Sequence, residues 1–399
     1  MAAALNESGY PDSVVIRLAV VLLCTLIIVA TFGFGLYLFS ALANDMRLEL
    51  GFSYSSIGVM TGMAQLGFLA GAVLSSVTVP RLGEAAVVVG AGAVTSASLI
   101  LMSQAEQIWL VGLLLVVLAM MAALAWTPMV ALIGQYIPPE HQAKSMGLIG
   151  SGTSYGIFIN GLLLPLLLDD YGWRTVWLAV GAGSLLVVIL AGLVLVTGSH
   201  CRNVQAMPSL REQWPALMAI RPWSLLLAVF FAGIGFITFM NFIPVYTLDQ
   251  RQLGVGVAGV LLMIIGSVGM FAGILCGALG DRVGIKPVIL SMALALFAAA
   301  IMVAVELPVT ALYVAAGMFG CAYVGYFALV PAYIGKHYPA TLVTSLFAGA
   351  NLAMAIGATF GNFLGGWSRD LSGSFVMLFV GVSMTALCVL LLSLRLRER

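Results

Sequence analysis

Charged residues are scarce in this sequence. Asp, Glu, Lys and Arg together make up 8% of its 399 residues, whereas a soluble domain carries about 25%. Hydrophobic residues make up 62% of the chain, which excludes a water-soluble globule. The net charge of +1 leaves no basic surface that could neutralise a run of phosphates, so we expect no nucleic-acid partner. The partner that this composition predicts is the lipid bilayer.

The sequence also lacks the usual signs of catalysis and of cofactor binding. Its five cysteines are widely spaced and match no disulfide framework or metal motif. The twenty methionines contain no M-x-x-x-M pair, which gives little support to a copper path. The motif G-x-G-x-x-G at Gly254–Gly259 opens an apolar run and follows no strand, so it predicts no nucleotide site. We expect no enzyme activity, no cofactor and no metal.

Long apolar runs dominate the sequence. Membrane-spanning helices need about 20 apolar residues, and barrel strands would instead alternate with a period of two. Backbone groups in lipid must be paired within each run, so the runs are predicted to be helices. The fold class is therefore an all-α membrane protein with twelve transmembrane helices. The runs are 15–42, 55–79, 85–103, 108–134, 146–168, 173–197, 222–248, 255–279, 288–305, 308–334, 342–366 and 373–394.

The basic residues predict how the chain is oriented. Twelve of the sixteen Lys and Arg residues fall in the termini and in the loops on the same side as the termini. The other side has only Arg47, Arg174, Arg251 and Arg369. Loops rich in Lys and Arg remain in the cytoplasm. We therefore expect a multi-pass protein of the cell (inner) membrane with both termini cytoplasmic.

The two halves of the chain resemble each other at a shift of about 200 residues. Gly33-x-Gly35 matches Gly233-x-Gly235, Arg81-x-Gly83 matches Arg282-x-Gly284, and Pro138 matches Pro339. The longest polar interval lies between the sixth and seventh runs. We predict a six-helix bundle at 1–197, a cytoplasmic middle loop at 198–221 and a second six-helix bundle at 222–399.

A short polar stretch from Gly277 to Pro287 separates two apolar runs. Gly284 would allow a backbone bend without Cβ strain, and Pro287 fits the first turn of the next helix. The spacing G-x-x-x-D-R-x-G-x-K-P resembles the signature loop of the major facilitator superfamily of secondary transporters. That resemblance implies two pseudo-symmetric six-helix halves that rock to give alternating access.

The resemblance assigns a gating role to this loop and to its degenerate copy in the first half. Its residues are Gly277, Asp281, Arg282, Gly284, Lys286, Arg81 and Gly83. In this family the loop carboxylate interacts with the positive end of a helix from the opposite half. For this chain, that implies a contact between Asp281 and the helix that begins near Ser145.

Other loops resemble a narrower branch of the superfamily. The segment from Pro138 to Gly147 and the triplet Gly172-Trp173-Arg174 are similar to bacterial members related to monocarboxylate and oxalate–formate carriers. Those carriers hold a carboxylate with an embedded Arg or Lys, which this sequence lacks. It also lacks the Gly-Pro pair that drug–proton antiporters carry in the fifth helix.

No Asp, Glu, Lys, Arg or His falls in the middle of a run. The absence of intramembrane charge disfavours a buried proton relay or an ionic clamp. A ligand would then be recognised by amides, hydroxyls and aromatic faces. By resemblance, the first, fourth, seventh and tenth helices line the cavity and the second, fifth, eighth and eleventh flank it. The candidate substrate-binding residues are Tyr37, Gln65, Trp126, Tyr155, Asn160, Asn241, Tyr323, Tyr326 and Asn351.

Each candidate also has a purely structural interpretation. Interhelical hydrogen bonds of Asn and Gln are common packing contacts, and Tyr and Trp are common at span ends. The sequence predicts a monomeric transporter, importing or exporting, with a small-molecule substrate. One alternative is an exporter of hydrophobic or drug-like compounds. Another is a non-transporting membrane sensor, which the short tails and middle loop disfavour.

Overall fold

The computed structural model describes residues 14–196 and 222–396, and these ranges form α-helices and short π-helices joined by brief turns. Eleven described helical segments are long and apolar enough to cross a membrane. One of them, Pro139–Leu195, is 57 residues long and contains two predicted spans. It is interrupted at Gly172, where φ is 73°. The fold class predicted from the apolar runs is therefore confirmed.

In the first half, some of the spans consist of several consecutive helices joined end to end. The elements are α1 (Val14–Ile28), η1 (Val29–Phe34), α2 (Gly35–Leu50), α3 (Tyr54–Leu82), α4 (Glu84–Met102), α5 (Ile108–Trp126), α6 (Met129–Tyr136), α7 (Pro139–Gly150), α8 (Gly152–Leu163), η2 (Leu164–Leu168), α9 (Asp169–Ala191) and η3 (Gly192–Val196). The π-helix η1 lies inside the first span and marks a local change in backbone pairing.

The second half repeats this arrangement. Its elements are α11 (Trp223–Ala232), η4 (Gly233–Ile237), α12 (Thr238–Val245), η5 (Tyr246–Gln250), α13 (Val255–Val283), α14 (Ile285–Ala304), α15 (Val309–His337), α16 (Ala340–Ser372) and α17 (Val376–Leu394). The π-helix η4 contains Gly233 and Gly235, as η1 contains Gly33. The sequence repeat thus corresponds to a repeated backbone irregularity.

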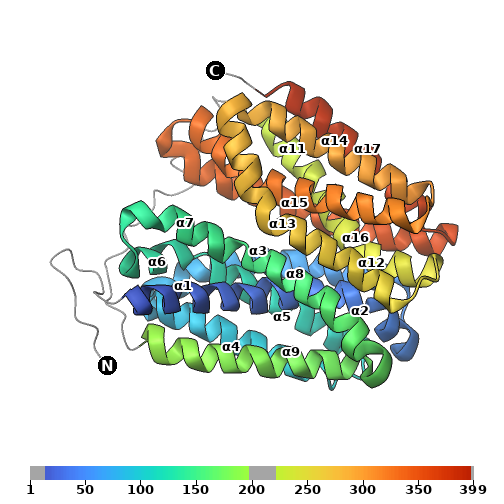
Figure 1. Ribbon diagram of the computed structural model, residues 1–399, viewed down its shortest axis with the longest axis horizontal. Helices are drawn as coiled ribbons and strands as arrows, with labels where there is room; N and C mark the ends of the chain where they lie inside the picture. Colours follow the sequence, from blue (N-terminus) through green and yellow to red (C-terminus); the bar gives the residue numbers. More distant parts are fainter. Residues whose placement is uncertain (1–13, 197–221, 397–399) are drawn as a thin grey trace. The chain divides into compact units, whose positions relative to one another are not determined.

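The chain forms two compact units. One contains Met1–Leu50 and Leu66–Val204, and the other contains Gly51–Gln65 and Gln205–Arg399. The first part of α3 therefore packs with the second unit, although it precedes the predicted boundary by more than a hundred residues. The predicted middle loop at 198–221 lies outside the described residues. Within the first unit α4 lies beside α9, and within the second α14 lies beside α15 (Figure 1).

Glycines set the closest helix crossings in both units. A Cβ at Gly33 would lie 2.4 Å from the Cα of Gly156, so η1 and α8 meet backbone to backbone. In the second unit a Cβ at Gly357 of α16 would lie 2.0 Å from the carbonyl oxygen of Phe230. Only glycine fits such crossings, because real Cβ atoms do not approach other atoms this closely.

Candidate functional site

In the first unit, the candidate residue Trp126 takes part in an aromatic contact that the sequence did not indicate. Phe32 of η1 packs edge-on against Trp126 at 6.0 Å and against Phe68 of α3 at 5.8 Å between ring centroids. Trp126 is the last residue of α5 and is half-buried. Tyr155 of α8 is also half-buried, whereas Tyr37 of α2 is buried. Trp126 and Tyr155 thus keep accessible surface within their own unit.

Asn160 has a structural partner. Its side chain is 1% exposed, and its Nδ2 donates a hydrogen bond of 2.8 Å to the carbonyl oxygen of Gly33. This bond lies beside the close approach of Gly33 and Gly156. The Oδ1 atom of Asn160 has no hydrogen-bond partner among the described residues. The amide therefore stabilises the crossing of η1 and α8, and its oxygen keeps unused acceptor capacity.

In the second unit, Tyr323 and Tyr326 of α15 belong to an aromatic cluster formed with α12, η4 and neighbouring turns of α15. Phe236 of η4 lies 6.0 Å from Tyr323 and 5.4 Å from Tyr326 between ring centroids. Phe319 stacks on Phe239 at 4.2 Å. We call these residues the α15 aromatic cluster: Phe236, Phe239, Phe319, Tyr323, Tyr326 and Phe327.

The remaining candidates of the second unit differ in burial. Asn241 is 3% exposed, and its Nδ2 donates a 3.0 Å hydrogen bond to Oδ1 of Asn362, which is fully buried. This pair joins α12 to α16. Gln65 of α3 and Asn351 of α16 are half-buried. Burial and pairing therefore favour a packing role for Asn241, while Gln65 and Asn351 keep accessible surface.

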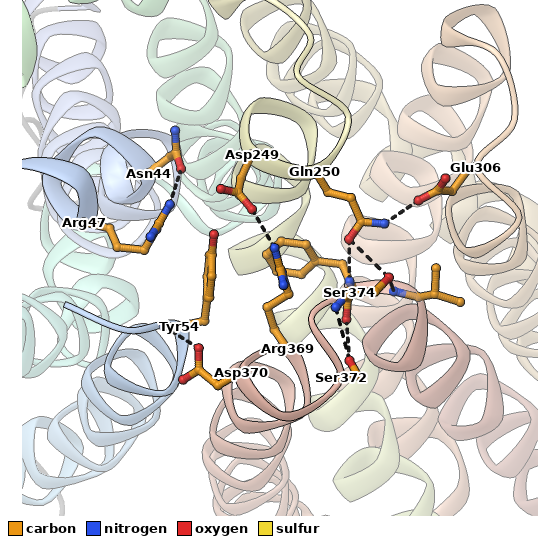
Figure 2. Close-up of polar contacts among 12 residues, drawn as sticks. Asn44, Arg47, Tyr54, Asp249, Gln250, Glu306, Arg369, Asp370, Ser372 and Ser374 are labelled. Carbon is orange, nitrogen blue, oxygen red and sulfur yellow. Dashed lines mark hydrogen bonds and ion pairs between the residues drawn. The ribbon is translucent and has the colours of Figure 1, made fainter. Parts of the chain in front are cut away.

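The charged residues of the described chain lie near helix ends, and the second unit gathers several of them around Arg369. Nη2 of Arg369 lies 3.0 Å from Oδ2 of Asp249 in η5. The guanidinium also lies over the ring of Tyr54, at 4.7 Å (Figure 2), and over that of Phe375, at 4.9 Å. Such stacking on aromatic faces favours Arg over Lys.

Asp370 connects α16 to the beginning of α3. Its Oδ1 accepts a hydrogen bond from the backbone N–H of Tyr54 at 3.2 Å (Figure 2). Its Oδ2 accepts one from the backbone N–H of Ser55 at 2.7 Å. The first N–H groups of a helix have no partner within the helix, and a carboxylate there also interacts favourably with the helix dipole. Asp370 therefore acts as a cap supplied by a helix more than 300 residues away.

Close backbone contacts continue this junction along α3 and α16. A Cβ at Gly58 would lie 2.3 Å from the carbonyl oxygen of Asn362, and one at Gly366 would lie 2.2 Å from that of Tyr54. Oγ1 of Thr359 donates to the carbonyl oxygen of Gly62 at 3.1 Å. This α3–α16 seam explains why residues 51–65 belong to the second compact unit.

The first unit has a similar ion pair at the end of α2. Glu49 pairs with Arg174 and also accepts a 2.6 Å hydrogen bond from Nε1 of Trp173. Glu49 precedes Asp249, the partner of Arg369, by 200 residues. The sequence repeat therefore extends to an acid–arginine pair in each unit. A depression of about 400 Å³ lies beside Glu49 and Trp173, and no candidate substrate-binding residue lines it.

The signature loop has the backbone that its sequence predicts. Gly284 has φ 97° between α13 and α14, and Gly83 has φ 80° between α3 and α4. Asp281, Arg282 and Arg81 are exposed. The other two loop residues, Gly277 and Lys286, are half-buried. The backbone bend predicted at Gly284 is confirmed, whereas the gating role of these residues stays a prediction.

The sequence did not indicate the contacts of Arg369 and Asp370. They were visible only as charges in a polar loop, because their partners Tyr54 and Asp249 lie far away in the chain. The one sequence feature that could have indicated these contacts was the adjacent pair of Arg369 and Asp370 at the end of an apolar run. Phe32 and Phe236 were equally hard to single out, because phenylalanine is common in such runs.

Comparisons with known proteins agree with this architecture. The sequence pattern of the Major Facilitator Superfamily matches residues 23–361. A solved bacterial homologue of the human lysosomal transporter Spinster, in an inward-facing unoccupied conformation, is similar with a TM-score of 0.77 and 18% identity. That match covers 97% of this chain and all of the other.

Two further solved structures show the same fold. A variant of the nucleoside transporter NupG has a TM-score of 0.77 at 13% identity, covering 96% of this chain and 100% of its own. A D-xylose-proton symporter has a TM-score of 0.76 at 14% identity, covering 96% of this chain and 98% of its own.

The repeated helical halves and the positive-φ signature loop define a secondary transporter fold. The chain belongs to the major facilitator superfamily, a family of small-solute transporters rather than enzymes.

Proposed function

We propose that this protein carries a small organic solute across the cytoplasmic membrane by rocker-switch alternating access, as a monomer, and binds it without an embedded charge. The observation that supports this proposal is the position of the charges. Each Asp, Glu, Lys, Arg and His of the described chain lies in a turn or within about two turns of a helix end. A mid-span site then offers amides, hydroxyls and aromatic faces.

Several half-buried candidates support a polar but uncharged binding site. Gln65, Tyr155 and Asn351 keep accessible surface and carry hydrogen-bonding groups. Trp126 adds an aromatic face next to Phe32. These groups suit a neutral or zwitterionic solute, or an anion held through hydroxyls and amides, and they provide no counter-ion of their own.

The experiment has two steps. Purified protein is first screened by thermal unfolding against uncharged, zwitterionic and anionic small organic solutes, because a ligand that binds only the folded state raises the unfolding temperature. The stabilising solute is then tested for counterflow in proteoliposomes with and without a protonophore. We expect stabilisation by an uncharged or zwitterionic solute and counterflow that the protonophore leaves unchanged. Stabilisation by anions alone, with transport driven by a proton gradient, would contradict the proposal.

Three solute classes come first in that screen. Two of the similar solved structures are named for a nucleoside and for D-xylose, both uncharged, although identities of 13% and 14% show the fold alone. Monocarboxylates are included because the segments at Pro138–Gly147 and Gly172–Arg174 resemble carriers of that branch.

The proposed location is the cell (inner) membrane, with both termini in the cytoplasm. The excess of Lys and Arg in the termini and in the loops on their side supports this orientation. A C-terminal reporter that fluoresces only in the cytoplasm should be bright. A dark reporter, together with activity of a C-terminal periplasmic phosphatase fusion, would reverse the orientation.

The α15 aromatic cluster supports a second candidate function, the export of hydrophobic or drug-like compounds. Stacked rings such as those of Phe239 and Phe319 present a broad apolar surface. In everted membrane vesicles, an exporter would accumulate a lipophilic fluorescent dye faster than vesicles without the protein. An importer of polar solutes would show no such difference.

A further inference from the structure

Three sulfur atoms from three different helices meet in the second unit. Sγ of Cys276 in α13 lies 3.8 Å from Sδ of Met292 in α14. The thiol of Cys321 in α15 interacts with the thiol of Cys276. Cys276 and Met292 are 4% and 8% exposed, respectively. We call Cys276, Met292 and Cys321 the sulfur cluster.

The absence of a side chain at Gly325 provides the space for the sulfur cluster. A Cβ on Gly325 would lie 2.7 Å from Sγ of Cys276 and 2.8 Å from Sδ of Met292. Cys321 precedes Gly325 by four residues on α15, so both lie on the same face of that helix. Any larger residue at Gly325 would push the sulfurs apart or away from α15.

We propose that the sulfur cluster is a binding site for one soft monovalent metal ion, Cu(I). Thiolate and thioether sulfurs select Cu(I) over harder ions. In a planar three-coordinate site with metal–sulfur distances of about 2.3 Å, neighbouring sulfurs lie about 4 Å apart. The distance of 3.8 Å between the sulfurs of Cys276 and Met292 is close to that spacing.

Charge and ligand number also favour a monovalent ion. If one of the two cysteines loses its proton to solvent, the thiolate and Cu(I) together are neutral, which reduces the cost of burial among apolar helices. Zinc instead takes four ligands from Cys, His or carboxylates. Among the described residues no three His, Cys, Asp or Glu side chains gather as metal ligands, so Met292 has to be the third.

The sulfur cluster lies near the signature loop. Cys276 precedes Asp281 by five residues on α13, and Met292 follows Lys286 by six on α14. At 1.5 Å per residue, both lie within about 10 Å of the loop along their helices. The sequence could not show this site, because its ligands come from three separate helices and follow no spacing rule.

The test is a competition titration of the reduced, full-length protein in detergent. Cu(I) is presented as its complex with a chromophoric Cu(I) chelator, and the fraction withdrawn by the protein is read from the loss of absorbance. The background variant combines Cys201→Ala and Cys388→Ala, which removes two thiols outside the cluster. We expect this background protein to bind one equivalent of Cu(I), with three sulfur scatterers at the metal by X-ray absorption.

Two variants decide the outcome. Met292→Leu preserves the volume and the apolar packing, so it should fold. It should bind Cu(I) at least about tenfold more weakly, because even the loss of an outer-shell partner of a metal ligand costs about 10–100-fold in affinity. Cys276→Ala should abolish binding. Unfolding temperatures measured without metal verify that each variant is folded. The proposal is overturned if the background protein withdraws no Cu(I), or if Met292→Leu binds it as tightly as the background does.

Discussion

The same residue type occupies different environments at different positions. Asn160 is buried, and its side-chain Nδ2 donates a hydrogen bond to the carbonyl oxygen of Gly33. Asn351 has accessible surface on α16. The first environment suits a packing contact and the second suits a contact with solute. Nothing in the sequence separates them, because both lie near the middle of glycine-rich apolar runs.

A pair of alanine substitutions distinguishes these roles. Asn160→Ala leaves the buried carbonyl of Gly33 without its partner, so the free energy of unfolding should fall by about 1–3 kcal/mol. Asn351→Ala should leave the unfolding temperature nearly unchanged and weaken solute binding by about tenfold. Thermal unfolding and ligand-induced stabilisation measure the two effects. Equal losses of stability in both variants would contradict this assignment.

Replacing Asp370 tests the cap that α16 provides to the N-terminus of α3. Asp370→Ala removes both acceptors from the backbone N–H groups of Tyr54 and Ser55. Losing a cap of this kind should lower the free energy of unfolding by about 1 kcal/mol. The matched control is Glu106→Ala, which removes another exposed carboxylate. The interpretation fails if the two variants unfold at the same temperature.

At the scale of helices, small residues decide where elements meet. The crossings of η1 with α8 and of α3 with α16 depend on Gly33, Gly156, Gly58 and Gly366, whose missing side chains let backbones touch. Other helical glycines, such as Gly183 in α9, have open space around the position of a Cβ. Glycine content alone therefore does not predict a helix crossing.

Two Gly→Ala substitutions should change stability in opposite directions. At Gly156 the new methyl group would lie 2.3 Å from the Cα of Gly33, and overpacking of this kind should cost about 1–3 kcal/mol or more. At Gly183 nothing lies within 4 Å, and Ala should stabilise the helix by about 0.5–1 kcal/mol. Chemical denaturation of the two purified variants measures both. A stabilised Gly156→Ala would refute the crossing.

Sequence patterns predicted the helices and their repeat, because membrane burial requires long apolar runs and internal pairing of the backbone. The turn at Gly284 was also predictable, since its conformation is a local property of glycine. The cap from Asp370 to Ser55, the stacking of Arg369 on Tyr54 and the sulfur cluster were not. Each joins residues from different helices, and helix periodicity does not specify which side chains of neighbouring helices meet.

At the scale of the whole chain, α3 belongs to both compact units. Its first turns pack against α16 through Gly58 and Gly62, while its later turns, with Gly67 and Gly71, pack against α5. Residues of one continuous helix thus pack in both units.

The signature loop supplies the last prediction, which concerns the balance between the two access states. Asp281 is exposed at the end of α13. The family resemblance implies that its carboxylate interacts with the N-terminus of the helix that begins near Ser145. Asp281→Asn removes the charge with almost no change in volume. We expect the ratio of the two states to change about fivefold, equivalent to about 1 kcal/mol.

Spin labels at Val130 and Leu394, both exposed and one in each unit, report this ratio as two distance populations. The matched control is Asp170→Asn, which neutralises an exposed carboxylate beside the helix interruption at Gly172. If Asp281→Asn leaves the two populations as they are in the control, the loop carboxylate does not hold either state.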